Sequence, residues 1–111
     1  MGTLPAFGLL VLAACLEAGG DALVRLGLHN HHGSGRLALF IAGAIVLFIY
    51  GLSVNAPPWD FGRLLGVYVT LFFVVAQIIN LVVFGTKPGL PIFVGGSFIL
   101  AGGLVMTFWR T

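Results

Sequence analysis

Apolar residues fall into four long runs along the chain, separated by short polar turns. The runs cover residues 4–28, 37–54, 64–84 and 90–109. Each is close to the ~20 residues that an α-helix needs to cross a bilayer core about 30 Å thick. We therefore predict an all-α fold, in which residues 1–111 form a single domain of four transmembrane helices. Because the connections are short, consecutive helices are expected to run antiparallel.

The turns between the runs contain residues that stop helices. Pro57 and Pro58 interrupt the second turn, and the sequence Gly-Thr-Lys-Pro-Gly fills residues 85–89. Proline removes a backbone donor and disfavours a helical residue before it, so a helix is not expected to continue through either turn. Trp59 and Trp109 fall near predicted helix ends, where aromatic side chains usually meet the membrane–water interface.

The composition supports a membrane location. Hydrophobic residues make up 59% of the chain and charged residues 7%, whereas a soluble domain has about 25% charged residues. The mean hydropathy is +1.15. The formal net charge of +2 is too small and too scattered to indicate nucleic-acid binding. We expect an integral protein of the cell membrane.

Three charged residues interrupt the first apolar run. Glu17, Asp21 and Arg25 are spaced four residues apart, so on a helix each is turned by only about 40° from the one before, and the row rises about 12 Å. An ionisable group near a bilayer centre costs about 2.5–3.5 kcal/mol. Such groups usually face a protein interior or a watery cavity, so this stripe is expected to do the same.

Glu17 is the strongest candidate for chemistry. Asp21 and Arg25 form the natural i, i+4 charge pair, and Arg25 near the helix end can extend to the lipid headgroups. That pair leaves Glu17 without a partner on its own helix. Desolvation disfavours the charged form of a carboxyl group, so a carboxylate in an apolar setting can exchange a proton near physiological pH, and it attracts a cation when ionised. The alternative is that the whole stripe is structural.

Several uncharged polar side chains fall within the other runs. Aromatic faces attract organic cations, so Tyr68 and Tyr50 are candidates to line a cation pocket with Glu17. A hydrogen-bonded packing role explains the two tyrosines equally well. Gln77 and Asn80 more often join helices than bind substrate in such settings.

Other classes of site have little support. His29, His31 and His32 fall in a turn beside Gly-Ser-Gly without a cysteine or carboxylate, which favours a solvated turn over a metal site. The sequence contains no recognisable nucleophile–base pair, so we do not expect an enzyme. Neither a metal nor another cofactor is expected.

Small residues recur at a regular spacing in the last run. The pairs Gly95–Gly96 and Gly102–Gly103 are seven residues apart, two helical turns on one face. In lipid, small residues mark the places where helices approach closely. We interpret Gly95 and Gly102 as a contact between two copies in a homodimer.

Basic residues in the turns do not favour one orientation. With alternating connections, Arg63 and Arg110 lie on one side of the membrane, and Arg36 and Lys87 lie on the other. Arg25 is assigned to the stripe within the membrane. The positive-inside rule therefore gives a tie, which predicts insertion in both orientations and an antiparallel dimer.

These features together resemble the small multidrug resistance family of the drug/metabolite transporter superfamily. Leu-Glu-Ala-Gly-Gly at residues 16–20, followed by Arg25, resembles the first-helix motif of that family. Phe-Gly-Thr-Lys-Pro-Gly-Leu-Pro at residues 84–91 resembles the turn before its fourth helix, and Gly95 and Gly102 fall on its dimerising glycines. Gly62-Arg63 followed by Gly-Val-Tyr-Val at residues 66–69 also resembles the YnfA-like relatives.

The resemblance implies an antiparallel homodimer in the bacterial inner membrane that exports small organic cations in exchange for protons, with the glutamate as the shared proton and substrate site. Thr70 and Phe72 stand where the family has kink glycines in its third helix, and Asp21 stands where it usually has a small or neutral residue. These departures favour the alternative, a non-transporting membrane subunit that partners another small membrane protein.

Overall fold

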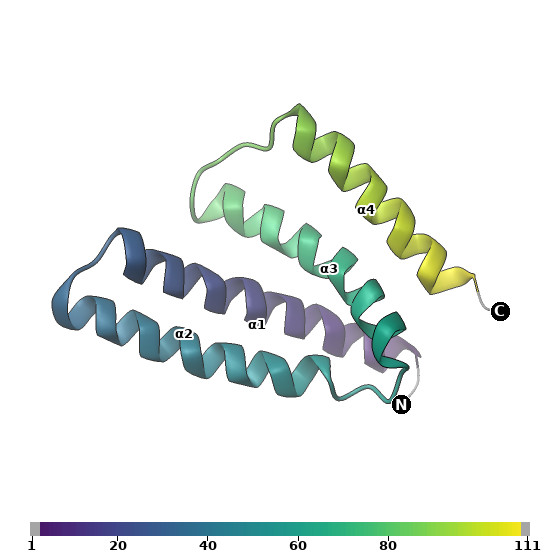
Figure 1. Ribbon diagram of the computed structural model, residues 1–111, viewed down its shortest axis with the longest axis horizontal. Coiled ribbons are helices and arrows are strands. Elements are labelled where there is room, and N and C mark those ends of the chain that lie inside the picture. Colours follow the sequence, from purple (N-terminus) through teal and green to yellow (C-terminus); the bar gives the residue numbers. More distant parts are fainter. Residues whose placement is uncertain (1–2, 110–111) are drawn as a thin grey trace.

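The computed structural model describes residues 3–109, and in that part of the chain it contains four α-helices (Figure 1). All four are long and apolar enough to cross a membrane. The all-α, four-helix membrane architecture predicted from the sequence is therefore confirmed. The helices are α1, Thr3–His29; α2, Gly33–Val54; α3, Phe61–Val82; and α4, Leu90–Phe108.

α1 and α2 form a close-packed antiparallel hairpin (Figure 1). A Cβ atom built on Gly43 would lie 2.7 Å from Cγ2 of Val24 and 3.2 Å from the Gly20 carbonyl oxygen. A Cβ atom on Gly20 would lie 2.7 Å from Cγ of Leu47, whereas one on Gly19 would meet nothing within 4 Å. Of the two adjacent glycines on α1, Gly20 is therefore the one that lets the helices approach.

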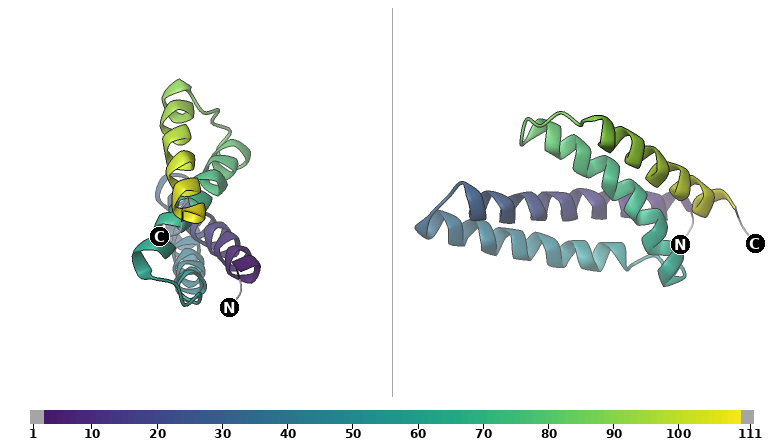
Figure 2. Two further views of the ribbon diagram at one scale, coloured as in Figure 1. Left: turned by 90° about the vertical axis from the view of Figure 1, so that its right-hand side faces the viewer. Right: turned by 45° about the horizontal axis from the view of Figure 1, so that its top comes forward.

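α3 packs on α1 at the start of both helices and diverges from it farther along, and α4 follows α3 back (Figures 1 and 2). The main hydrophobic core lies where α1, the end of α2 and the start of α3 meet. Small alanines on α1 let the larger side chains of α3 approach its backbone. The buried members of this core are Leu10, Ala13, Ala14, Val54, Leu64, Val67 and Tyr68.

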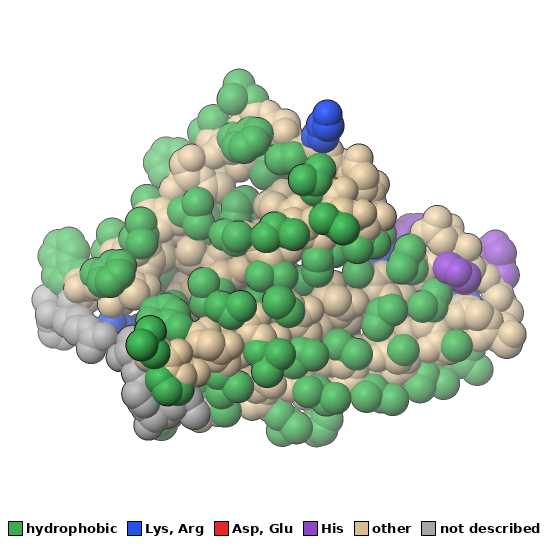
Figure 3. Space-filling model, turned by 180° about the vertical axis from the view of Figure 1, so that it is seen from behind, with side chains coloured by type: hydrophobic (Ala, Val, Ile, Leu, Met, Phe, Trp, Pro, Cys, Tyr) green, Lys and Arg blue, Asp and Glu red, His purple; other side chains and the backbone are tan. Residues whose placement is uncertain are grey.

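Much of the apolar surface is uncovered. The chain exposes 7002 Å², whereas a compact soluble protein of 11.7 kDa exposes about 5,900 Å². In Figure 3, hydrophobic side chains are spread over the whole visible face, and histidine side chains gather at one end. Lipid or another protein must cover this surface, since water would not solvate it favourably.

α2 begins at Gly33, four residues before the predicted start at residue 37. Gly33 has a positive φ of 61°, which lets the chain reverse and enter the helix at once. The Arg36 side chain in the first turn donates hydrogen bonds to the carbonyl oxygens of Gly27, Leu28 and His31, at 3.0, 3.2 and 3.1 Å. These bonds give the charged guanidinium polar partners at the end of α1 and in the turn, so Arg36 can stand in the first turn of α2.

α3 begins at Phe61, three residues before the predicted start at residue 64. Asp60 precedes it and accepts a hydrogen bond from the backbone N–H of Arg63 at 3.1 Å, which is the usual arrangement of an N-cap. The Arg63 side chain donates to the Thr107 carbonyl oxygen at 3.1 Å, at the end of α4. Asp60 thus fixes the start of α3, and the Arg63 side chain fixes the position of the end of α4 relative to it.

The remaining helix ends differ slightly from the prediction. α3 ends at Val82 rather than residue 84, because the chain turns through Gly85 with a φ of 65°, and the Thr86 N–H bonds to the Asn80 carbonyl oxygen at 3.1 Å. α4 ends at Phe108, one residue before the prediction. Arg110, used above in the tally of basic residues, lies outside the described residues.

Candidate functional site

Glu17 lies near the middle of α1 and bonds to a tyrosine of α3. The Tyr68 hydroxyl donates to Oε1 of Glu17 at 2.6 Å and lies 3.4 Å from the Ala13 carbonyl oxygen. Tyr68 itself is 3% exposed, and Glu17 is half-buried. A short hydrogen bond to a carboxyl oxygen is of the stronger kind, so Tyr68 fixes the direction of the Glu17 side chain.

Aromatic rings line this carboxyl group. The centres of the Tyr50 and Tyr68 rings lie 5.8 Å apart, and the Tyr68 and Phe72 rings lie 6.1 Å apart and nearly parallel. The structure therefore brings together Glu17, Tyr68 and Tyr50, the three residues that the sequence analysis singled out for the proton and substrate site. Phe72 was not singled out for this role, and its spacing of four residues from Tyr68 is the signal that would have found it.

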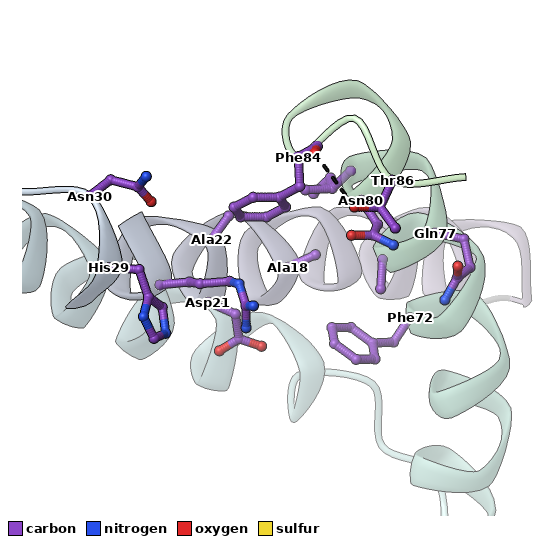
Figure 4. Close-up of a pocket in the computed structure, with 13 residues that line it drawn as sticks. Ala18, Asp21, Ala22, His29, Asn30, Phe72, Gln77, Asn80, Phe84 and Thr86 are labelled. Atoms are coloured by element: carbon purple, nitrogen blue, oxygen red, sulfur yellow. Dashed lines mark hydrogen bonds between the residues drawn. The ribbon is translucent and has the colours of Figure 1, made fainter. Parts of the chain in front are cut away.

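Asp21 and Arg25 face a neighbouring cavity rather than the tyrosines. This cavity has a volume of about 620 Å³ and lies between α1, the second half of α3 and the turn after it. In Figure 4, Asp21 and His29 come from α1, Asn80 from α3 and Phe84 from the turn. The Arg25 guanidinium lies 5.7 Å from the centre of the Phe84 ring. The charge pair between Asp21 and Arg25 stays a prediction.

The two amide residues of the third membrane run also line this second cavity. Gln77 and Asn80 are among its wall residues, with Thr86 beyond them. They lie across from α1 and away from Glu17, and their role in joining helices stays a prediction. Phe84 was not predicted to take part, because it falls at the very end of an apolar run.

The three histidines do not gather at a common point. His29 lines the cavity of Asp21, and Nδ1 of His31 lies 3.2 Å from the Leu26 carbonyl oxygen. All three histidine side chains are exposed. Within residues 3–109, no three His, Cys, Asp or Glu side chains are grouped closely enough to hold a metal ion.

The two glycine pairs of α4 divide between two surfaces. Gly96 and Gly103 are buried against α3, where an added Cβ would meet the Phe73 ring and the Thr70 side chain respectively. Gly95 and Gly102 are exposed, and an added Cβ would meet nothing within 4 Å. The glycines predicted to contact a second copy are thus on the open side of the helix.

The fold and this site define a small, four-helix integral membrane protein with one carboxylate held by a tyrosine near the middle of α1. The chain belongs to a specific family of this class. Residues 4–111 match the family described as "Uncharacterised BCR, YnfA/UPF0060 family". This family is similar to the small multidrug resistance proteins, so the resemblance drawn from the sequence is confirmed at the level of the family.

Relatives along nearly the whole chain carry the same description. A "UPF0060 membrane protein" of Kineococcus radiotolerans is 38% identical over 108 residues, covering 96% of this chain and 95% of the relative. The protein of Mycolicibacterium vanbaalenii is 38% identical, covering 88% of this chain and 90% of the relative. That of Saccharopolyspora erythraea is 36% identical, covering 90% of this chain and 89% of the relative. No solved structure matches the chain.

Proposed function

We propose that this protein is a proton-coupled exporter of small organic cations, in which Glu17 binds either the proton or the substrate. The observation that carries the proposal is the short hydrogen bond from Tyr68 to Glu17 inside an aromatic wall. A carboxylate attracts a cation, and the half-buried rings of Tyr50 and Phe72 offer a further attraction to an organic cation. Tyr68 is buried and acts through its hydroxyl, which holds Glu17 in place.

Exchange follows from competition at one group. Protonated Glu17 is neutral and offers little electrostatic attraction, whereas ionised Glu17 attracts the cation. A cation that arrives from one side therefore displaces a proton, and a proton that arrives from the other side displaces the cation. The export direction then follows from the proton gradient, provided that the site opens to only one side at a time.

The working unit in this proposal is an antiparallel homodimer. Gly95 and Gly102 lie on an exposed face of α4, where nothing would meet an added Cβ within 4 Å. Small residues let helices approach closely in lipid, which supports this face as the contact between the two copies. The tie of basic residues between the two sides supports insertion in both orientations. Reporter fusions at the C-terminus that work on each side should both give signal, and two added lysines in one set of turns should leave signal on one side only.

Proton release is the direct test of the shared site. Detergent-solubilised protein is mixed in weakly buffered solution with quaternary ammonium ions of increasing size, and the released protons are measured with a pH indicator. We expect release that saturates with cation concentration, and apparent cation affinity that rises with pH until Glu17 is fully ionised. Glu17→Gln should abolish both the release and the pH dependence.

Two variants serve as controls. Glu17→Asp should keep cation binding but shift the pH range, because the shorter side chain meets Tyr68 differently. Asp21→Asn, one turn away, should retain proton release. If Asp21→Asn removes the pH dependence while Glu17→Gln leaves it intact, the wrong carboxylate has been assigned. If neither variant matters, the charged stripe is structural, and the protein is a non-transporting membrane subunit.

A further inference from the structure

The cavity beside Asp21 is separate from the Glu17–Tyr68 site. Its walls come from residues 18–30 of α1 and the turn after it, residues 72–80 of α3, and the turn that follows α3. Phe72, which stacks on Tyr68, stands between the two sites and also lines this cavity. Glu17 is not among its wall residues. The cavity therefore has its own set of charges, which the proposed exchange does not use.

These charges have opposite signs, and both side chains are exposed in the single chain. Asp21 and Arg25 both line the cavity from α1, one turn apart, so their backbones are separated by about 6 Å along the helix axis. The Arg25 guanidinium extends over the Phe84 ring, 5.7 Å from its centre, and so reaches toward the α3 side of the cavity. A ligand with a single charge would meet one attractive and one repulsive partner.

The opposite wall supplies uncharged groups. Asn80, Gln77 and Thr86 line the cavity from α3 and its following turn, and Figure 4 shows Asn80 and Thr86 next to each other, across from α1. Amides and hydroxyls can donate or accept hydrogen bonds. They can therefore satisfy either end of a polar ligand, while the ring of Phe72 and the small side chains of α1 contact its apolar part.

We propose that this cavity binds a small organic zwitterion, with its ammonium group at Asp21 and its acidic group at Arg25. Such a ligand is neutral overall, so it satisfies both side chains at once. One helical turn between Asp21 and Arg25 sets the scale of the spacing, and we choose a ligand with three or four carbon atoms between its two groups to match it. The proposal goes beyond cation export, because Glu17 takes no part in it.

Calorimetry with three matched probes tests the assignment. The probes are 4-aminobutyrate, which carries both charges, n-butylammonium, which lacks the acid, and butyrate, which lacks the amine. We expect 4-aminobutyrate to bind the full-length protein in a non-ionic detergent at least about tenfold more tightly than either single-charge probe, since each lost charged contact is worth about that factor. Equal binding of n-butylammonium and 4-aminobutyrate would overturn the proposal.

Variants locate the site and separate it from the proposed export function. Asp21→Asn and Arg25→Gln should each weaken 4-aminobutyrate binding about tenfold, whereas Glu17→Gln should leave it within about twofold. Arg25→Lys keeps the charge and should retain binding, so it distinguishes lost recognition from lost folding. If Glu17→Gln also removes zwitterion binding, or if Arg25→Lys binds no better than Arg25→Gln, the assignment to this cavity is wrong.

A membrane lipid can supply the same chemistry, because phosphatidylethanolamine carries an ammonium and a phosphate in its headgroup. Nanodiscs of phosphatidylethanolamine and of phosphatidylglycerol distinguish the two sources. If the headgroup is the occupant, 4-aminobutyrate binding is lost in the first discs and kept in the second. If a solute is the occupant, both discs bind it equally. Absence of binding in both discs and in detergent would overturn the proposal.

Discussion

α1 and α4 show two opposite ways of placing a helix in a membrane protein. α1 carries Glu17, Asp21 and Arg25, and it contacts both α2 and α3. α4 carries no charge, and only Gly96 and Gly103 are buried on it. Its large side chains, such as Phe98 with 76% exposure, face outward. The helix with charges packs against two neighbours, and the uncharged helix packs against one.

The difference shows which property determines the position of each helix. Charged groups are costly in lipid, and the small residues of α1 let its neighbours approach its backbone. These neighbours half-bury Glu17, whereas Asp21 and Arg25 stay exposed beside their cavity, contrary to the expectation that the whole stripe would be covered. Apolar side chains lose nothing by facing lipid, so hydrophobicity cannot attach α4 to the others. Close packing at small residues such as Gly96 and Gly103 attaches α4 to α3 instead. Substitutions at the close contacts of α1 and of α4 should therefore lower the stability of the protein to different extents.

The largest effect is expected at the tight contact between α1 and α2. Gly43→Val would place new atoms against Val24 and the Gly20 carbonyl oxygen, and overpacking of this kind costs about 1–3 kcal/mol. We expect a value near the upper end, because the Gly20 carbonyl group belongs to the backbone of α1 and cannot move aside like a side chain. The loss is measured as a decrease in the thermal stability of the detergent-solubilised protein. Gly51→Val on the same helix is the matched control, because nothing would lie within 4 Å of its added Cβ. If Gly51→Val lowered the thermal stability as much as Gly43→Val, the tight contact between α1 and α2 would be refuted.

A smaller effect is expected at the inner glycines of α4. Gly103→Val would press against the Thr70 side chain, but α4 can shift outward, so we expect a cost of about 1–2 kcal/mol. Gly102→Val, at the adjacent open position, should leave monomer stability unchanged and weaken association of two copies. Thermal stability and cross-linking in detergent separate the two outcomes. A dimer that resists Gly102→Val would show that this face is not the interface.

A cost of about 1 kcal/mol is expected for the hydrogen bond that joins α1 to α3. Tyr68→Phe keeps the ring and removes only the hydroxyl that donates to Glu17. Tyr50→Phe, in the neighbouring ring, is the control and should cost less. The same two tyrosine variants are then compared in a Glu17→Gln background. There the difference in stability between them should become smaller, because the Tyr68 hydroxyl donates to a neutral amide oxygen instead of a carboxylate.

The smallest effect is expected where α4 ends near the start of α3. Arg63→Gln removes the bond to the Thr107 carbonyl oxygen. Because this site lies at the membrane surface, we expect a loss of at most about 1 kcal/mol, measured as a shift in thermal stability. Arg36→Gln, which loses three carbonyl contacts in the turn between α1 and α2, should cost more. The reverse order would contradict the view that the hairpin of α1 and α2 is the more firmly held.

The sequence predicted the parts of the structure that depend on a repeating pattern. The four helices follow from apolar run length. The predicted stripe of Glu17, Asp21 and Arg25 instead divides between two sites, with Glu17 at Tyr68 and the other two at the neighbouring cavity. The partner of Glu17 followed less directly, since Tyr68 was proposed for its chemistry rather than for its place on α3. Family membership was also recognisable, because the quoted motifs lie in sequence segments that are continuous.

The remaining features depend on how helices meet, which one sequence does not specify. Nothing in the chain distinguishes Gly102 from Gly103, yet one is open and the other packs on Thr70. The cavity of Asp21 depends on the divergence of α3 from α1, and this angle follows from side-chain packing in three dimensions. The earlier start of α2 depends on the positive φ of Gly33, and that of α3 on the N-cap bond that Asp60 accepts. Such local features extend a helix beyond its apolar run.

The bonds of the two arginines at helix ends bear on how the family can evolve. Arg36 and Arg63 each hold backbone carbonyl groups at the end of a helix, so replacing either disturbs the fold as well as the charge balance. Lys87 is exposed in the turn between α3 and α4. On the proposed topology, a single codon change there would alter the balance of basic residues across the membrane at little structural cost. In the proposed dual-topology dimer, a change of orientation through position 87 would therefore disturb the fold less than a change through either arginine.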